Sequence, residues 1–332
     1  MSEGEEGGDA AEVRTALTQL GFYDAAETEA LHITRLGGLT NRVFAVNGPK
    51  GRHVLRIPGR GTEEYIDRRV EKVAAEAAAR AGVSPKVLAA RDDGLMLSEA
   101  IVECRTMSAA SFASVPGAVA RAARALRVLH DSGEKFTFTF ALFVMVDQYL
   151  AILKTKNASV PNGYYQMLDE AAEVRAALAA HPLPSCPCHC DPLAENFLDT
   201  GQRMWIVDWE YSGMNDPAWD IGDLAVEAEL SPENERILVE TYFGGVPTPY
   251  EHGRVVIYKA MCDLLWTLWG LIQHANANPA DDFWAYANRR FDRCRALMAT
   301  PEFAACVRNV AAGPNARTRR VFGWSWPWAR TS

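Results

Sequence analysis

The sequence has no run of eighteen uncharged apolar residues, and it opens on MSEGEEGGDAAEV, which is acidic where a secretory signal would be basic and then apolar. A regular cysteine framework is also absent. The seven cysteines are an odd number, spread from Cys104 to Cys306, which is typical of a reducing compartment. We therefore expect a cytoplasmic protein without a transmembrane segment.

Positive charge is scarce as well. The formal net charge is −8, so a polyanion would be repelled over most of the surface, and no basic patch large enough to offset this is visible. We expect no nucleic-acid partner, and the sequence carries no signal of oligomeric state. Internal repeats and low-complexity linkers are missing too, and 332 residues suit two lobes of one catalytic unit better than one core.

The first hundred residues predict a sheet and one helix. Residues 1–8 suggest a solvated tail, followed by a short helix capped by Asp9. Residues 33–57 alternate β-rich runs with turns (HITRL, RVFAV, RHVLRI), which predicts a pair of hairpins. A helix is predicted from about 63 to 81, ended by Gly82, and two more short strands follow it, KVLAA and GLMLSEAI.

Beyond Cys104 the periodicity becomes helical, with long helices predicted at 116–130, 142–153 and 163–180. The runs ENFLD and MWIVDWE predict a β-hairpin around the turn Thr200-Gly201. We therefore predict an α+β protein with an N-terminal lobe (1–100), a mainly helical C-terminal lobe (101–332), a hinge at 99–103 and a basic, Trp-rich tail from about 315 to 332.

The predicted hairpin follows a motif that points to phosphoryl transfer. His189, Asp191 and Asn196 have the H-x-D-x-x-x-x-N spacing of kinase-like phosphotransferases, and Asp208 and Glu210 follow on the next strand. The reaction needs one carboxylate to orient and deprotonate the acceptor hydroxyl, and oxygen ligands to hold Mg²⁺.

We expect Asp191 to be the base, and Asn196 and Asp208, facing each other across the hairpin, to bind the metal with Glu210. His189 is expected to brace the loop. The alternative is a buried His-Asp pair in a turn with a surface aspartate nearby.

The segments CHCDPLAENFLD and IVDWEYSGMNDPAWDIGDLAVE resemble choline/ethanolamine kinases, within a group that includes aminoglycoside phosphotransferases. LGGLTNRVFAV resembles the nucleotide loop of that family, RHVLRIPGRGTEEYIDRRVE its next strand and helix, and LLWTLWGLIQ a C-terminal aromatic helix. The resemblance implies a protein-kinase-like two-lobe fold with ATP and Mg²⁺ between the lobes. It also implies transfer of the γ-phosphate to the hydroxyl of choline or ethanolamine.

In the glycine loop, Gly37 and Gly38 would let backbone amides approach phosphate oxygens, while Thr40 and Asn41 would add side-chain donors. An ordinary hairpin turn explains the same residues.

Arg56 stands where protein kinases place a strand lysine, and the resemblance implies that it binds the α- and β-phosphates. We expect it to pair with Glu71, in IDRRVE, with Glu76 as the alternative. A surface salt bridge is the other interpretation of either pair.

A quaternary ammonium cannot donate hydrogen bonds and is held best by aromatic faces near a carboxylate. Trp266 and Trp269 lie one helical turn apart, and with Tyr211, Glu227 and Tyr286 they match the positions that form the cationic pocket of choline kinases. The residues alone favour core packing for the tryptophans, because an apolar helical stripe runs beside them, made of Val255, Tyr258, Cys262, Leu265 and Ile272. Choline and ethanolamine both suit such an aromatic cage with one carboxylate, so the residues do not decide between them.

Two further patterns carry less weight. Cys186, Cys188 and Cys190 suggest zinc, but alternate residues of an extended segment lie about 7 Å apart and no second ligand pair follows, so no zinc is expected. The Arg- and Trp-rich tail could contact an anionic membrane surface, but docking on its own lobe or disorder is favoured.

Two other functions fit the sequence less well. An aminoglycoside kinase would want an acidic mouth for its polycationic substrate, and only Asp281 and Asp282 point that way, since the C-terminus is basic and aromatic. A catalytically dead nucleotide-binding scaffold would not need the full set of Asp191, Asn196, Asp208 and Arg56.

Overall fold

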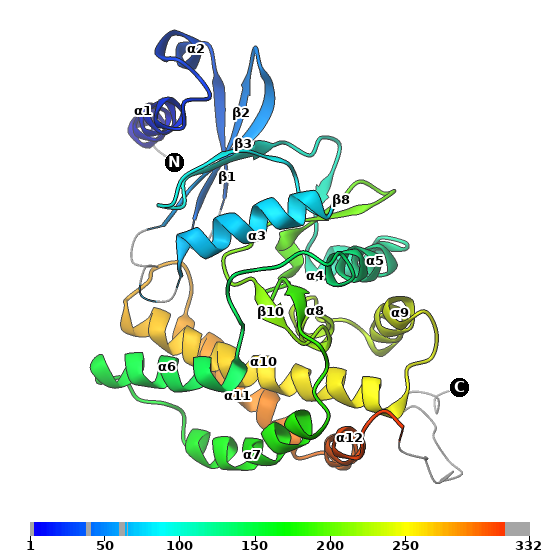
Figure 1. Ribbon diagram of the computed structural model, residues 1–332. Helices are drawn as coiled ribbons and strands as arrows, with labels where there is room; N and C mark the ends of the chain where they lie inside the picture. The colour runs from blue at the N-terminus through cyan, green and yellow to red at the C-terminus, as the bar shows by residue number, and fades with distance from the viewer. Residues whose placement is uncertain (1–2, 38–40, 60–63, 65, 316–332) are drawn as a thin grey trace.

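The computed structural model describes residues 3–37, 41–59, 64 and 66–315 (Figure 1). The positions Gly38 and Thr40 of the glycine loop, and residues 316–332 of the predicted tail, lie outside the described residues. A sheet forms one end of the molecule and a bundle of helices forms the other. This arrangement confirms the predicted α+β architecture.

The sheet has five antiparallel strands in the order β1-β2-β3-β5-β4. Buried and half-buried side chains alternate along β2, as expected for a strand with one face in the core. Phe44 and Val46 are buried while their neighbours are half-buried, and Phe44 pairs with the buried Leu55 of β3. The strands are β1 (His32–Gly37), β2 (Arg42–Gly48), β3 (Gly51–Ile57), β4 (Val87–Ala90) and β5 (Met96–Glu99).

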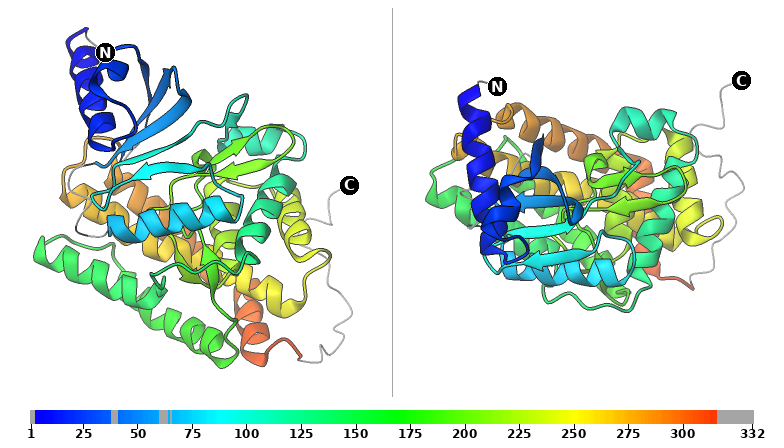
Figure 2. Two further views of the ribbon diagram at one scale, coloured as in Figure 1. Left: turned by 45° about the horizontal axis from the view of Figure 1, so that its top comes forward. Right: turned by 90° about the horizontal axis from the view of Figure 1, so that it is seen from above.

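Helix α1 (Glu3–Gln19), followed by α2 (Ala25–Glu29), packs on the outer side of this sheet (Figure 2). Val13 and Leu17 of α1 share a core with the sheet residues. The helix begins at Glu3 and not at Asp9, so the predicted start of this helix is wrong.

Helix α3 (Arg68–Arg80) lies between the sheet and the helical end (Figure 1). It begins later than the predicted residue 63, because Asp67 caps it by accepting a hydrogen bond from the Arg69 amide at 3.0 Å. Its alanine face, including Ala74 and Ala77, is buried in the same core as the helices below.

The helical end surrounds α10, which packs against α6, α8, α11 and α12. Glycine allows close approach, because a Cβ on Gly222 of α8 would lie 2.8 Å from the Val255 carbonyl oxygen of α10. The helices are α4 (Ala109–Ser114), α5 (Ala118–His130), α6 (Leu142–Thr155), α7 (Tyr164–Ala180), α8 (Ala218–Glu227), α9 (Pro232–Phe243), α10 (Pro249–Ala275), α11 (Phe283–Met298) and α12 (Pro301–Ala312).

Within the described residues, α10 alone is long and apolar enough to cross a membrane, but 89% of its apolar window is buried inside the protein. The central helix of a folded core can have the same length and apolar composition as a membrane-spanning helix.

Short strands connect the two ends. The predicted hairpin around Thr200-Gly201 is present as β8 (Phe197–Asp199) and β9 (Met204–Ile206), and β6 (Arg105–Thr106) extends it. A second small sheet pairs β7 (Cys186–Cys188) with β10 (Gly213–Asn215). Between β7 and β8 lie a loop and a 3₁₀ turn, η1 (Ala194–Asn196), which carry the phosphotransferase motif.

Candidate active site

The loop that carries the motif, residues 189–196, is shaped by the fully buried Asp220 of α8. One oxygen of Asp220 accepts from the His189 amide at 2.7 Å, and the other accepts from the Cys190 amide at 2.8 Å. Cys190 has φ 67°, a left-handed conformation that costs energy outside glycine. The buried carboxylate therefore holds the loop in a strained shape through two charge-assisted hydrogen bonds.

His189 links this loop to the segment that carries Asp208. Its Nε2 lies 2.9 Å from the Val207 carbonyl oxygen, and its Nδ1 lies 3.3 Å from the Asp191 amide. Burial lowers the pKa of His189, so the ring is neutral with one donor and one acceptor nitrogen. These contacts are those of the brace that was predicted.

Asp191 and Asn196 lie next to each other, since the Asn196 amide donates to the Asp191 carbonyl oxygen at 3.0 Å. The Asn196 carbonyl in turn accepts from the Val207 amide at 2.9 Å, which places it beside Asp208. Burial, and then the charges of Glu227 and Asp208, raise the pKa of Asp191 well above its usual range. Asp191 therefore lies within electrostatic reach of carboxylates on both of its sides.

On one side lies a group that we call the nucleotide-side cluster: Arg56, Arg68, Glu71, Asp208 and Glu210. Arg56 forms an ion pair with Glu71, and its Nη1 lies 3.3 Å from Asp208 Oδ1. Arg68 Nη1 lies 2.9 Å from Glu71 and 3.0 Å from Glu210. Of the two carboxylates considered for Arg56, the structure thus pairs it with Glu71 and not with Glu76.

Asn41 contacts this cluster in a way that the glycine-loop pattern did not predict. It is 3% exposed, its amide nitrogen donates to Glu210 Oε2 at 2.8 Å, and its Oδ1 accepts from Arg68 at 3.1 Å. Two buried charged groups therefore contact Asn41, and its role as a donor to phosphate stays a prediction. Gly37 is the last residue of β1.

The oxygen donors of the cluster suit a hard cation. Carboxylate oxygens of Glu71, Asp208 and Glu210 all lie within 4.8 Å of one another. Glu71 and Glu210 are buried against arginines, whereas the Asp208 side chain is 33% exposed and its backbone has φ 68°. Mg²⁺ prefers such oxygen ligands, and the guanidinium of Arg56 suits a phosphate. These residues fit a metal-nucleotide complex.

On the other side, the structure brings together the four predicted aromatic rings. The Trp269 indole donates to the Tyr211 hydroxyl at 2.8 Å, and the Trp269 and Tyr286 ring centres are 5.7 Å apart. Tyr211 and Trp266 meet edge to face, with ring centres 5.2 Å apart. Trp266 is 3% exposed, as a core residue would be, and Trp269 is half-buried.

Two charged residues that sequence analysis missed complete this acceptor side. Arg290 forms an ion pair with Glu227 at 2.5 Å and lies over the Tyr286 ring, 4.6 Å from its centre. Asp223 is fully buried and accepts from the Trp266 indole at 3.3 Å. Burial, and then the charges of Glu227 and Asp191, raise the pKa of Asp223 well above its usual range.

A signal for both residues was present in the helical spacing. Asp223 lies one turn before Glu227, and Arg290 lies one turn after Tyr286, so each shares a helix face with a residue that the motif comparison selected.

Asp191 lies on a loop beside a cluster of arginines and carboxylates, between an antiparallel sheet and a helical bundle. This arrangement defines a small-molecule phosphotransferase. A model of the phosphotransferase enzyme family matches residues 32–251. A solved choline/ethanolamine kinase family protein from Mesorhizobium loti is 54% identical, with TM-score 0.82, over 91% of this chain and 99% of that one.

Choline kinase LicA from Streptococcus pneumoniae is 25% identical, with TM-score 0.72, over 87% of this chain and 98% of that one, and LicA has also been solved in complex with AMP. Protein LicA of Haemophilus influenzae is 29% identical over 86% of this chain and 85% of its own length. The chain belongs to the phosphotransferase enzyme family and, within it, to the choline/ethanolamine kinases.

Proposed function

We propose that this protein transfers the γ-phosphoryl group of ATP to the hydroxyl of choline or ethanolamine. Asp191 orients the acceptor hydroxyl and takes its proton. Asn196, Asp208 and Glu210 hold Mg²⁺, and Arg56, positioned by Glu71, binds the α- and β-phosphates. Gly37, Gly38, Thr40 and Asn41 contact the phosphates, a part of the proposal that rests on the sequence pattern alone.

The observation that carries this proposal is the position of Asp191 between two unlike groups of charges. The pKa of its carboxyl is raised by burial, by Glu227 on the acceptor side and by Asp208 on the nucleotide side. A raised pKa suits a general base, because the best catalytic base has a pKa near the working pH. When bound, Mg²⁺ would neutralise charge on the phosphates and so favour their approach to the acceptor.

The acceptor is proposed to lie against Tyr211, Trp266, Trp269 and Tyr286, with Glu227 nearby. Aromatic faces attract a cation whether or not it can donate hydrogen bonds, which suits choline and also accepts ethanolamine.

An aminoglycoside acceptor is less well supported. Asp281 and Asp282, the acidic residues that hinted at it, are used locally, because Asp282 caps α11 by accepting from the Ala285 amide at 3.0 Å and Asp281 accepts from the Asp282 amide at 2.7 Å. A dead scaffold would not need the arginine-carboxylate geometry around Asp208.

The function is tested by measuring ADP release in a coupled assay with ATP, Mg²⁺ and a panel of acceptors: choline, ethanolamine, their N-methylated intermediates and an aminoglycoside. We expect turnover with choline or ethanolamine and none with the aminoglycoside. Turnover with the aminoglycoside alone would overturn the proposal, as would ADP release that no acceptor stimulates.

We further propose that the chain divides into the lobes 1–100 and 101–332 and works in the cytoplasm. The proposed hinge at 99–103 begins where β5 ends, and Glu103 within it has φ 53°.

A further inference from the structure

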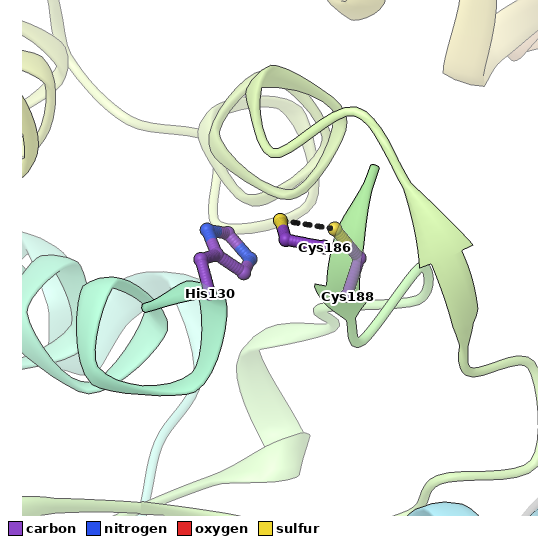
Figure 3. A group of neighbouring side chains, drawn as sticks. All are labelled: His130, Cys186 and Cys188. Carbon is purple, nitrogen blue, oxygen red and sulfur yellow. Dashed lines mark hydrogen bonds between the residues drawn. The ribbon is translucent and has the colours of Figure 1, made fainter. Parts of the chain in front are cut away.

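A second group of metal-binding side chains lies behind the 189–196 loop, apart from the nucleotide-side cluster. Cys186 and Cys188 project from β7 toward each other, and His130 reaches them from the end of α5 (Figure 3). One ligand atom from each of the three residues lies within 4.8 Å of the other two. We propose that these residues bind a thiophilic divalent cation such as Zn²⁺ or Cd²⁺.

The distance between the two sulfurs supports this site. The Sγ atoms of Cys186 and Cys188 are 3.6 Å apart. With metal-sulfur bonds of about 2.3 Å, two thiolates of a tetrahedral zinc site lie roughly 3.8 Å apart, whereas a disulfide requires about 2.05 Å. The separation therefore matches two ligands of one metal ion and not a covalent bond.

This geometry corrects the argument against zinc drawn from the sequence. Alternate residues of a strand do lie far apart along the backbone, but their side chains share a face, and here the two thiols lean toward each other. The third ligand comes from a helix 56 positions earlier (His130 to Cys186), so no local spacing pattern revealed it.

Hydrogen bonds fix the orientation of the His130 imidazole, as they do for metal-binding histidines. Its Nε2 lies 2.9 Å from Asp220 Oδ2, and its Nδ1 lies 2.7 Å from the Tyr242 hydroxyl. A metal ion takes one ring nitrogen and displaces one of these partners, while the other partner still fixes the ring. Metal-bound histidines in proteins usually keep such an outer partner, most often a carboxylate or a carbonyl.

The ligand types select the class of cation. Two sulfurs and one imidazole favour zinc-like metals, and they disfavour Mg²⁺ and Ca²⁺, which prefer oxygen. Burial, and then the neighbouring Cys186 and Asp220, raise the pKa of the Cys188 thiol well above its usual range. The thiol is therefore neutral without a metal, and it must release a proton when a metal binds.

The site is joined to the Asp191 loop through one residue. Asp220, which holds the amides of His189 and Cys190, is also the partner of His130 Nε2. A cation bound here would connect β7 to α5 next to the 189–196 loop.

The test is a Cd²⁺ titration of the reduced, full-length protein in excess Mg²⁺, which occupies oxygen sites without competing for thiolates. We expect one equivalent of Cd²⁺ to produce the ultraviolet band of sulfur-to-cadmium charge transfer, and Zn²⁺ to displace it. In Cys186→Ser, affinity should fall about tenfold or more, since even the loss of an outer-shell partner costs that much. His130→Gln should weaken binding and keep the band.

Cys104→Ser is the matched control, because Cys104 is a free, half-buried cysteine outside this group. It should bind Cd²⁺ as the unaltered protein does. Zn²⁺ should also raise the melting temperature of the unaltered protein and of Cys104→Ser, but not that of Cys186→Ser, because binding stabilises only the state that has the site. The proposal fails if the band is absent, if it survives equally in Cys186→Ser, or if Cys104→Ser abolishes it.

Discussion

The two sides of Asp191 differ in how their carboxylates are paired. On the nucleotide side, Arg56 and Arg68 contact all three carboxylates of the cluster, Glu71, Asp208 and Glu210, at 3.3 Å or closer. On the acceptor side, Arg290 pairs with Glu227, while Asp223 has no ion pair with a cation among the described residues and accepts a hydrogen bond from the Trp266 indole.

This difference matches the charges of the proposed ligands. ATP is an anion, so its side needs cations, and each arginine there is kept in place by carboxylates when the nucleotide is absent. The acceptor is a cation, and on its side the buried Asp223 forms no ion pair with an arginine or lysine of the described residues. An unpaired buried carboxyl is costly in the empty protein, and the cost is relieved when a positive charge binds. The following variants test this division of labour.

The largest effect is expected where the two sides meet. Asp191→Asn should lower kcat about 10²- to 10⁴-fold, because the acceptor hydroxyl loses its base. Asp208→Asn should be similarly impaired through the loss of a metal ligand. Steady-state kinetics at rising Mg²⁺ separates the two: Asp208→Asn should recover in part, and Asp191→Asn should stay inactive. Equal rescue of both variants, or full activity in either, contradicts the assignment.

A smaller effect, confined to the nucleotide side, is expected from Arg56→Ala. Loss of a charged hydrogen bond of about 1.5–3 kcal/mol should raise the KM for ATP roughly tenfold or more and leave the KM for the amino alcohol nearly unchanged. Steady-state kinetics with each substrate varied in turn checks this.

Removing Arg56 also leaves the buried Glu71 with less compensation, which can cost about 3–5 kcal/mol of stability. Arg56→Lys, which keeps the charge, and melting temperatures therefore accompany the kinetics. Arg69→Ala is the control, since Arg69 pairs with Asp67 on the surface at 2.8 Å and should change neither KM. A rise confined to the KM of the amino alcohol would place Arg56 on the wrong side.

The same comparison shows what the sequence could and could not predict. Strands such as β2 and the β8-β9 hairpin were found because alternation and turn residues are local signals. Asp220, Asp223 and Arg290 were missed. Helical spacing puts Asp223 and Arg290 on the faces of Glu227 and Tyr286, but the ion pair of Glu227 with Arg290 joins two helices, so neither helix alone reveals the pairing.

Asn41 of the glycine loop shows a second kind of contact that local patterns do not reveal. Its neighbours in the chain predict a phosphate donor, and the fold also places its amide against Glu210, which lies 169 positions away. Local motifs identify which residues are near the chemistry, and the fold decides which of them satisfy each other.

On the acceptor side, Trp266→Ala or Trp269→Ala should raise the KM for choline roughly two- to thirty-fold and leave the KM for ATP nearly constant, because each ring contributes about 0.5–2 kcal/mol of cation-π attraction. The phenylalanine variants should do less harm. If the rings only pack the core, truncation should instead cost about 3–5 kcal/mol of stability without changing the choline KM of the folded enzyme.

Melting temperatures measured beside both KM values separate these outcomes. Trp284→Ala is the matched control, since Trp284 is 43% exposed on α11 and should leave the choline KM unchanged.

The smallest effect is expected from Asp223→Asn, which keeps the size of the side chain and removes one negative charge behind Trp266. The KM for choline should rise about two- to tenfold, since the cation loses its attraction to the Asp223 carboxylate. A second change follows from the repulsion between Asp223 and Asp191. The base works when deprotonated, so kcat/KM falls as the pH falls through the pKa of Asp191.

Removing a neighbouring negative charge lowers that pKa, so in Asp223→Asn the fall in kcat/KM should move to lower pH. A pH profile of kcat/KM for choline measures the shift, and Asp281→Asn, at the exposed start of α11, is the control that should not move it. A purely structural role for Asp223 predicts a lower melting temperature with an unmoved profile. A shift to higher pH would contradict the proposed negative charge of Asp223 beside Asp191.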